Sequence, residues 1–174
     1  MIAKTFFGFE EILANELKAL GAQDVEQGVR MVSFKGDKGF MYKANLSLRT
    51  ALKILKPIYS FRANNENALY KGISGVNWSK YLNANQTFVI DATVHSEYFN
   101  HSEFVSQKCK DAIVDQFRER TGQRPSIEKI HPDLRINIHI DKDQVSVALD
   151  TSGNSLHQRG YRPATNIAPI NEVL

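Results

Sequence analysis

The sequence of 174 residues contains a single cysteine, Cys109. One thiol can neither form an internal disulfide nor hold a structural zinc ion by itself, so neither kind of covalent or metal cross-link is expected. Proteins of the reducing cytoplasm use cysteine in this way, and we expect a cytoplasmic location.

The sequence also lacks any apolar run close to the length of a membrane-spanning helix. Near its N-terminus, Phe6 and Phe7 are adjacent, but no basic segment is followed by a long apolar core. We therefore expect no membrane partner and no signal peptide.

Several motifs of nucleotide-binding enzymes are missing. The sequence has no Walker motif and no Gly-x-Gly-x-x-Gly after a strand-like run, so a Rossmann-type pocket for a nucleotide or methyl donor is not expected. Its five prolines are never adjacent, which excludes any motif that needs Pro-Pro. We expect no cofactor in this chain.

Charge is present at ordinary density, with 24% charged residues beside 42% hydrophobic ones and a net charge of +3. This composition is typical of a globular protein with a core, and it permits nucleic-acid binding without requiring it. The distribution is more informative than the total. Between residues 40 and 62 there is no acid, and the basic residues there are Lys43, Arg49, Lys53, Lys56 and Arg62.

The first half of the chain predicts alternating strands and helices. An amphipathic helix is expected over residues 9–20, with Gly21 as its stop signal, and a second helix over 38–56, ended by Pro57. Strands are expected over residues 2–6, 29–35 and 58–63. This order predicts a ferredoxin-like α/β sandwich, with a domain boundary at residues 64–67.

The second half predicts another α/β domain, so the fold class is α+β. An interrupted helical segment (68–78) and a strand (86–95) precede a long helix, with Ser102 as its N-cap and Gly122 as its stop. The predicted buried face of that helix is Val105, Cys109, Ala112, Ile113 and Phe117. Strict alternation over 134–140 and 145–149 predicts a hairpin.

Catalytic and metal sites have weak support. Asp150, Ser152, Ser155 and His157 are close in sequence, but their spacing matches no nucleophile motif. The five histidines are scattered without the spacing of a zinc site. Lys71 and the following Gly72-Ile-Ser-Gly75 resemble the Gly-x-x-Gly loop of KH domains, a spacing that also arises by chance.

Basic residues form the candidate RNA-binding set. If residues 38–56 are helical, Arg49, Lys53 and Lys56 share one face of that helix. Further basic groups are expected near loops, and Tyr161 offers a stacking face between two arginines. The complete candidate set is Arg49, Lys53, Lys56, Lys108, Arg124, Arg135, Arg159, Tyr161 and Arg162.

A family resemblance covers the whole chain. Asp150-Thr-Ser-Gly-Asn-Ser-Leu-His-Gln-Arg-Gly-Tyr-Arg162, followed by Asn166-Ile-Ala-Pro-Ile-Asn-Glu172, resembles the junction between two domains in bacterial THUMP-containing RNA methyltransferases. Ile170 replaces the usual leucine of the second motif. Phe7-Gly-Phe-Glu-Glu-Ile-Leu-Ala-Asn-Glu-Leu17 is similar to the family's N-terminal motif. Further matches follow in order at residues 44–51, 99–117, 124–125 and 134–137.

The resemblance implies a domain organisation and a role. It implies a ferredoxin-like domain (1–64), a THUMP domain (65–160, with a family profile that starts as early as about residue 43) and a linker with the start of a methyltransferase domain (161–174). The family methylates guanine N2 in large-subunit rRNA with S-adenosylmethionine, and THUMP presents structured RNA to the catalytic domain. That domain's Pro-Pro motif is absent here, so the chain alone is expected to be no enzyme.

Two alternatives stay open at this point. The chain is a stand-alone THUMP-type adaptor that binds RNA and recruits a partner, or it is the THUMP portion of a tRNA-modifying enzyme.

Overall fold

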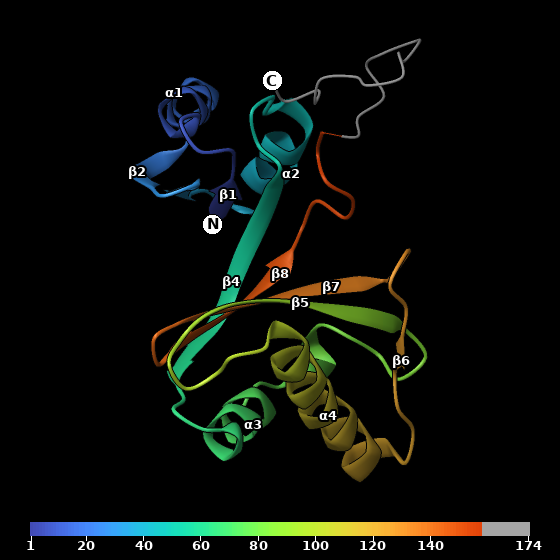
Figure 1. Cartoon of the computed structure of the whole chain (residues 1–174). Helices are drawn as coiled ribbons and strands as arrows, with labels where there is room; N and C mark the ends of the chain where they lie inside the picture. Colours follow the sequence, from blue (N-terminus) through green and yellow to red (C-terminus); the bar gives the residue numbers. More distant parts are fainter. Residues whose placement is uncertain (158–174) are drawn as a thin grey trace, which may run out of the picture. The chain divides into compact units, whose positions relative to one another are not determined.

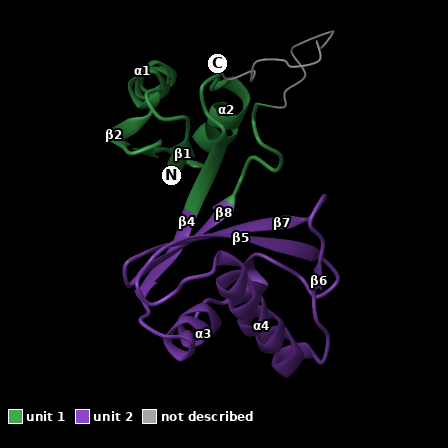
Figure 2. Ribbon diagram, viewed as in Figure 1, with its two compact units in different colours: residues 1–56, 150–174 green, residues 57–149 purple. Residues whose placement is uncertain are grey.

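Two compact units make up the chain in the computed structural model, which describes residues 1–157 (Figure 1). The first unit contains Met1–Lys56 together with the described residues from Asp150 onward, and the second contains Pro57–Leu149 (Figure 2). The chain therefore leaves the first unit within one strand and returns to it at the end of another.

The first unit follows the order strand, helix, strand, strand, helix, strand. Its elements are β1 (Ile2–Lys4), α1 (Glu10–Leu20), β2 (Gln23–Gly28), β3 (Met31–Lys35), α2 (Lys38–Ser47) and β4 (Lys53–Arg62). The strands lie in the order β2-β3-β1-β4, and each neighbouring pair is antiparallel. Leu13 of α1 and Ala44 of α2 pack in one core with Val32 of the sheet. This is the ferredoxin-like sandwich that the sequence predicts.

The first helix agrees closely with its prediction. Leu13 and Leu17 are fully buried on its inner face. Glu10 and Glu11 occupy its first turn and Lys18 its last, which complements the helix dipole. Gly21 ends the helix in the left-handed region at φ 99°, a conformation that costs glycine little.

The second helix is shorter than predicted. α2 ends at Ser47, and Leu48 has extended backbone at ψ 129°. The Leu52 N–H then donates to the Lys4 carbonyl at 2.8 Å, and β4 begins at the next residue. Leu48 and Ile54 are both fully buried in the same core. The spacing of Ala44, Leu48 and Ala51 fits a helix, but pairing with β1 makes the chain from Lys53 onward a strand.

The strand β2 is not predicted by the sequence pattern. Its residues, Gln-Asp-Val-Glu-Gln-Gly, are mostly exposed because the strand lies at the edge of the sheet. An edge strand of this kind buries little apolar surface and therefore lacks the alternation by which strands are recognised.

The second unit places helices on one face of a mixed sheet. Its elements are α3 (Glu66–Ser74), the 3-10 turn η1 (Trp78–Lys80), β5 (Thr87–His95), α4 (Ser102–Thr121), β6 (Ser126–Ile127), β7 (Leu134–Asp141) and β8 (Gln144–Asp150). The strand order is β8-β7-β5-β6, with the end of β4 beside β8. β5 is parallel to β6 and β7, and β7 and β8 form the predicted antiparallel hairpin. Figure 1 shows α3 and α4 on the same side of this sheet.

The predicted inner face of α4 is confirmed. Val105, Cys109, Ala112 and Ile113 are fully buried, and Phe117 is 4% exposed. The helix ends at Gly122, which has φ 69°. The expected role of Ser102 as the N-cap is wrong: His101 is the N-cap, with extended backbone and no side-chain cap bond, and Ser102 is the first helical residue.

A buried glutamine fixes the segment between α3 and β5 onto α4. The Gln116 Oε1 accepts a hydrogen bond from the Trp78 N–H at 3.0 Å, and its Nε2 donates to the carbonyls of Ser74 and Val76, both at 2.8 Å. The Trp78 indole donates to the Ile73 carbonyl at 2.9 Å. These bonds satisfy a buried amide, an indole and backbone groups that have no helix or sheet partner.

Among residues 1–157, no helix combines the length and the apolar character that crossing a bilayer requires.

Replacing Gln116 by methionine should destabilise the second unit. The change keeps the side-chain volume similar but leaves one buried N–H and two carbonyls without partners, which costs about 1–3 kcal/mol of unfolding free energy. Urea unfolding followed by the fluorescence of Trp78, the only tryptophan, measures this. Gln107→Met is the control, because Gln107 is exposed on the same helix and should change stability by no more than about 0.5 kcal/mol. Equal effects of the two variants would contradict the assigned role of Gln116.

Candidate nucleic-acid interface

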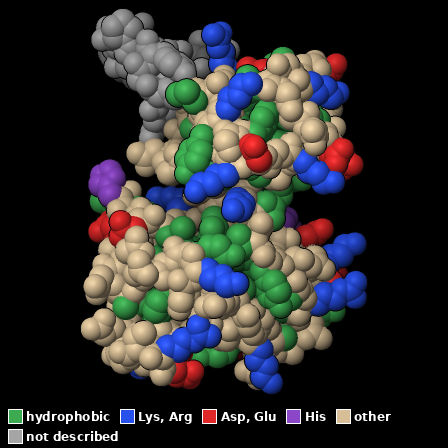
Figure 3. Space-filling model, turned by 180° about the vertical axis from the view of Figure 1, so that it is seen from behind, with side chains coloured by type: hydrophobic (Ala, Val, Ile, Leu, Met, Phe, Trp, Pro, Cys, Tyr) green, Lys and Arg blue, Asp and Glu red, His purple; other side chains and the backbone are tan. Residues whose placement is uncertain are grey.

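Six of the nine candidate RNA-binding residues lie in the described part of the chain. Arg49, Lys53 and Lys56 belong to the first unit, and Lys108, Arg124 and Arg135 belong to the second. Arg159, Tyr161 and Arg162 lie outside the described residues. On the face shown in Figure 3, lysine and arginine side chains are spread over both units rather than gathered in one patch.

The three candidates of the first unit do not form a helical face. Arg49 is exposed between α2 and β4, whereas Lys53 and Lys56 belong to β4. The expectation of one basic helix face is wrong because the helix ends before any of the three. Whether Arg49 and Lys56 contact RNA stays a prediction.

Lys53 has a structural partner. Its Nζ lies 3.0 Å from a carboxylate oxygen of Asp150, whose side chain is 1% exposed. The other oxygen of Asp150 accepts hydrogen bonds from the N–H and the hydroxyl of Ser152, both at 2.9 Å. The Ser152 hydroxyl oxygen accepts in turn from the Ile54 N–H at 2.8 Å. The contacts of Asp150 and Ser152 thus hold the chain after β8 against the start of β4.

Backbone hydrogen bonds also join the chain after β8 to residues 52–54. The Thr151 N–H donates to the Ile54 carbonyl at 2.9 Å, and the Leu156 N–H donates to the Leu52 carbonyl at 2.8 Å. His157 contacts the Ser155 hydroxyl at 2.7 Å through its Nδ1, not Ser152. Ser155 and His157 are thus in contact, but the carboxylate of Asp150 contacts Lys53 and Ser152 instead of His157. Among the described residues these four side chains form no Ser-His-Asp triad, which needs the carboxylate to orient the histidine.

Two candidates of the second unit line one groove. Lys108 and Arg124 lie with Lys110 and Arg118 around a hollow of about 540 Å³ between the outer face of α4 and the segment of β6. We call this hollow the basic groove. Arg118 and Arg124 also line an adjoining hollow at the C-terminal end of α4. The sequence reasoning missed Lys110 and Arg118, although their spacing of eight along a predicted helix would have placed them on one face.

Weak ion pairs hold three of the four cations. Lys108 pairs with Glu66 at 3.3 Å, Lys110 with Asp111 at 3.0 Å and Arg118 with Asp115 at 3.3 Å. Surface pairs of this kind contribute little net energy, so a phosphate group can replace the carboxylate at small cost. Arg124 is exposed and has no acidic partner among residues 1–157.

A hydrogen-bonded chain orients Arg118. The Tyr70 hydroxyl donates to Asp115 Oδ2 at 2.9 Å, and Arg118 donates to Asp115 Oδ1. The hydrogen bond to Asp115 is the main cause that raises the pKa of Tyr70, and burial is the second. The hydroxyl therefore remains a donor at neutral pH. The arrangement leaves most guanidinium N–H groups of Arg118 free to bind the oxygens of a phosphate.

Arg135 is separate from the basic groove. Its guanidinium donates to both oxygens of Asp91, at 3.2 and 3.4 Å, and to the Lys129 carbonyl. Its side chain is 17% exposed. These contacts give Arg135 a role in joining β5 and β7, and they leave it poorly placed for a phosphate.

The Gly-x-x-Gly segment is part of a helix end. Gly72 lies within α3, where an added Cβ would come within 2.1 Å of the Phe61 ring. Gly75 caps the helix, and its N–H donates to the Lys71 carbonyl. Close packing explains Gly72, and the N–H groups of this segment do not form a phosphate loop.

Other reactive side chains give no further site. Burial raises the pKa of the Cys109 thiol to about 12, so this cysteine is a core residue with no thiolate at neutral pH. His95 and His139 are neighbours with ring centroids 5.9 Å apart. Within residues 1–157 no cluster of histidine, cysteine, aspartate or glutamate could hold a metal ion.

The described residues do not fit the methyl donor that the family resemblance implies. Such a donor is held by a glycine-rich turn between a parallel strand and a helix. β5 is the parallel strand that leads directly into a helix, α4, and the residues between them, Ser-Glu-Tyr-Phe-Asn-His, include no glycine.

Each of the two units matches the model of a known domain family. A model described as the THUMP domain matches residues 63–150, and a model described as the RlmL ferredoxin-like domain matches residues 1–55. The chain is 44% identical over 167 residues to a Ribosomal RNA large subunit methyltransferase K/L of Syntrophotalea carbinolica. This match covers 96% of the chain and 23% of the relative, so the chain spans about a quarter of that protein's length.

Solved structures show the same fold. A possible methylase from Clostridium difficile 630 matches with a TM-score of 0.84 and 29% identity, over 99% of this chain and 45% of that one. SMU.472, described as "a putative methyltransferase complexed with SAH", matches with a TM-score of 0.79 and 30% identity, over 94% of this chain and 44% of that one.

Lys53→Met should destabilise the first unit, because it leaves the buried carboxylate of Asp150 without its cation. We expect a loss of about 1–3 kcal/mol, measured by hydrogen exchange of the Ala3 and Ile54 amides. The matched control is Lys56→Met, an exposed position of the same strand, with an expected change of no more than about 0.5 kcal/mol. The double variant with Asp150→Asn should recover part of the loss. A Lys53 variant as stable as the Lys56 variant would show that the ion pair is not structural.

Proposed function

Because the chain belongs to the THUMP-domain family, we propose that it is the RNA-binding, substrate-recognition portion of an S-adenosylmethionine-dependent RNA methyltransferase. The observation that carries this proposal is the basic groove, in which Lys108, Lys110, Arg118 and Arg124 surround one hollow of the THUMP unit. Cations on a fixed scaffold bind the phosphate backbone of RNA and position it for another domain.

The methyltransferase K/L relative supports a more specific form of the proposal. Its printed name assigns it to large-subunit ribosomal RNA, so we propose that the RNA bound here is rRNA and that the modified position is guanine N2. The catalytic reaction and the methyl donor belong to a further domain of the whole enzyme. Ribosomal RNA as substrate is also consistent with a cytoplasmic location.

Four side chains of the basic groove would contact the phosphates of the RNA. Arg118, oriented by Asp115, offers a planar pair of donors to one phosphate, and Arg124 offers a second without giving up an existing partner. Lys108 and Lys110 act as point charges along α4. Such contacts bind structured RNA with little dependence on sequence and determine its position on the THUMP unit.

The double variant Arg118→Gln/Arg124→Gln should weaken binding of an RNA hairpin and make it less dependent on salt. Each lost phosphate contact lowers the slope of log affinity against log salt by about one, so we expect a reduction of about two. Filter binding at several salt concentrations measures the slope, and Trp78 fluorescence verifies the fold.

Lys142→Gln is the matched control, because Lys142 is an exposed cation of the same unit that does not line the basic groove. Its removal should change the slope by less than half as much. If the double variant keeps the wild-type slope while the chain still binds RNA, the groove is not the interface. If the wild-type chain binds no RNA, the proposed function itself is wrong.

The 174-residue chain alone should not bind S-adenosylmethionine, because its parallel strand–helix connection lacks the glycine-rich turn. Titration calorimetry tests this expectation. Binding in the low micromolar range would contradict the assignment of the methyl donor to another domain.

A further inference from the structure

The strand β5 has an open edge over most of its length. On one side β7 pairs with it from Phe88 to His95. On the other side β6 pairs only with Thr87 and Phe88. Among the described residues, no strand continues the line of β6 beside the rest of β5.

The direction of the backbone groups follows from the existing bonds. The N–H groups of Ser126 and Glu128 donate to the carbonyls of Gln86 and Phe88. Even-numbered residues of β5 therefore point their backbone groups toward the β6 side, since direction alternates along a strand. The N–H and C=O groups of Ile90 and Ala92 thus face outward, and no bond within residues 1–157 joins them to a group outside the sheet.

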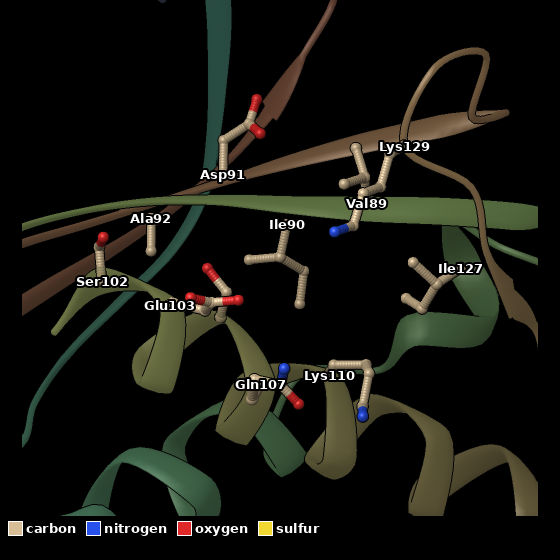
Figure 4. Close-up of a pocket in the computed structure, with 11 residues that line it drawn as sticks. Val89, Ile90, Asp91, Ala92, Ser102, Glu103, Gln107, Lys110, Ile127 and Lys129 are labelled. Carbon is tan, nitrogen blue, oxygen red and sulfur yellow. The ribbon is translucent and has the colours of Figure 1, made fainter.

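A groove of about 520 Å³ runs along this edge, between β5 and α4. Figure 4 shows Ile90 and Ala92 directed from β5 toward α4, with Ser102, Glu103 and Gln107 on the opposite wall. Ile127 closes the end of the groove next to β6. The floor is thus aliphatic, and the rim carries polar groups.

The two ends of the groove carry opposite charge. Glu103 lies at the end near Ala92 (Figure 4), and Lys110 and Lys129 lie toward Val89 and Ile127. The groove therefore favours an occupant with an acidic group at the β6 end and a basic group at the Ala92 end.

We propose that the edge of β5 and the groove beside it bind an extended peptide segment of a partner protein, which adds a parallel strand in line with β6. A strand edge alternates donors and acceptors, and a peptide backbone presents both with the same period. A ribose–phosphate backbone presents mostly charged acceptors, with the 2′-hydroxyl as its donor, so it matches the carbonyls of Ile90 and Ala92 less well than a peptide does. This protein contact differs in kind from the proposed RNA binding, and Lys110 lines both grooves.

The bound segment has definable chemistry. Its N-terminal end lies next to Lys110 and Lys129 and carries an acidic side chain, and small apolar side chains alternate toward Ile90 and Ala92. Natural proteins protect open strand edges with proline, bulges or charges that point into the edge. Asp91 points to the other side of the sheet in Figure 4, so this edge lacks such protection between Val89 and Ala92.

A synthetic peptide provides the test. The probe is blocked at both ends and about seven residues long, the length of an ordinary strand, with alternating valine and threonine between an N-terminal glutamate and a C-terminal lysine. Added to the 174-residue chain, it should slow hydrogen exchange of the Ile90 and Ala92 amides at least about tenfold. Without peptide both amides should exchange fast. The same peptide with its alternate amides N-methylated should give no protection.

The variant Ala92→Pro removes one edge donor, and an edge strand tolerates proline where its N–H faces outward. It should abolish peptide binding while Trp78 fluorescence and RNA affinity stay unchanged. Protection of the Ile90 and Ala92 amides in the free chain would overturn the proposal, since the edge would then be occupied. Protection by a single-stranded polyuridine probe and not by the peptide would overturn it in favour of RNA.

Discussion

The packing of α4 on its sheet determines the position of three of the four cations in the candidate interface. Val105, Cys109 and Ile113 are fully buried against the strands, and this apolar stripe fixes the rotation of the helix about its axis. Lys108, Lys110 and Arg118 must then lie on the flanks and the outer face. The same constraint forms both grooves beside α4, because the helix covers one face of the sheet and leaves the β5 edge uncovered beyond β6.

A second constraint closes the first unit. Asp150, although nearly inaccessible to solvent, accepts from Ser152 and pairs with Lys53. A buried carboxylate is tolerated when its charge is compensated, and here Lys53 compensates the charge while Ser152 satisfies one of the two oxygens. The polar sequence after β8, which resembles a functional loop, therefore has a structural role up to His157. This assignment shifts the expected RNA contacts from Lys53 to the second unit.

Much of the fold could be predicted from the sequence, because its signals are local. The stripe of α1, the inner face of α4 and the alternation of β7 and β8 each depend on neighbours within one element. The end of α2 and the existence of β2 depend on pairing with distant strands, and the sequence pattern does not contain that information. Lys53 and Asp150 are joined for the same reason: their contact exists only after the chain returns from the second unit. Of the four cations that line the basic groove, the candidate set from the sequence included Lys108 and Arg124 but not Lys110 and Arg118.

The central claim is that the THUMP unit binds RNA in the basic groove beside α4. The most direct test is an NMR titration of the ¹⁵N-labelled chain with an RNA hairpin, with the amide shifts mapped by residue. The account predicts that the largest changes fall on Lys108, Lys110, Arg118 and Arg124, and that Arg135 and Lys53 change little. Shifts concentrated on the first unit, or on the sheet face around His139, with the groove unaffected, would contradict it.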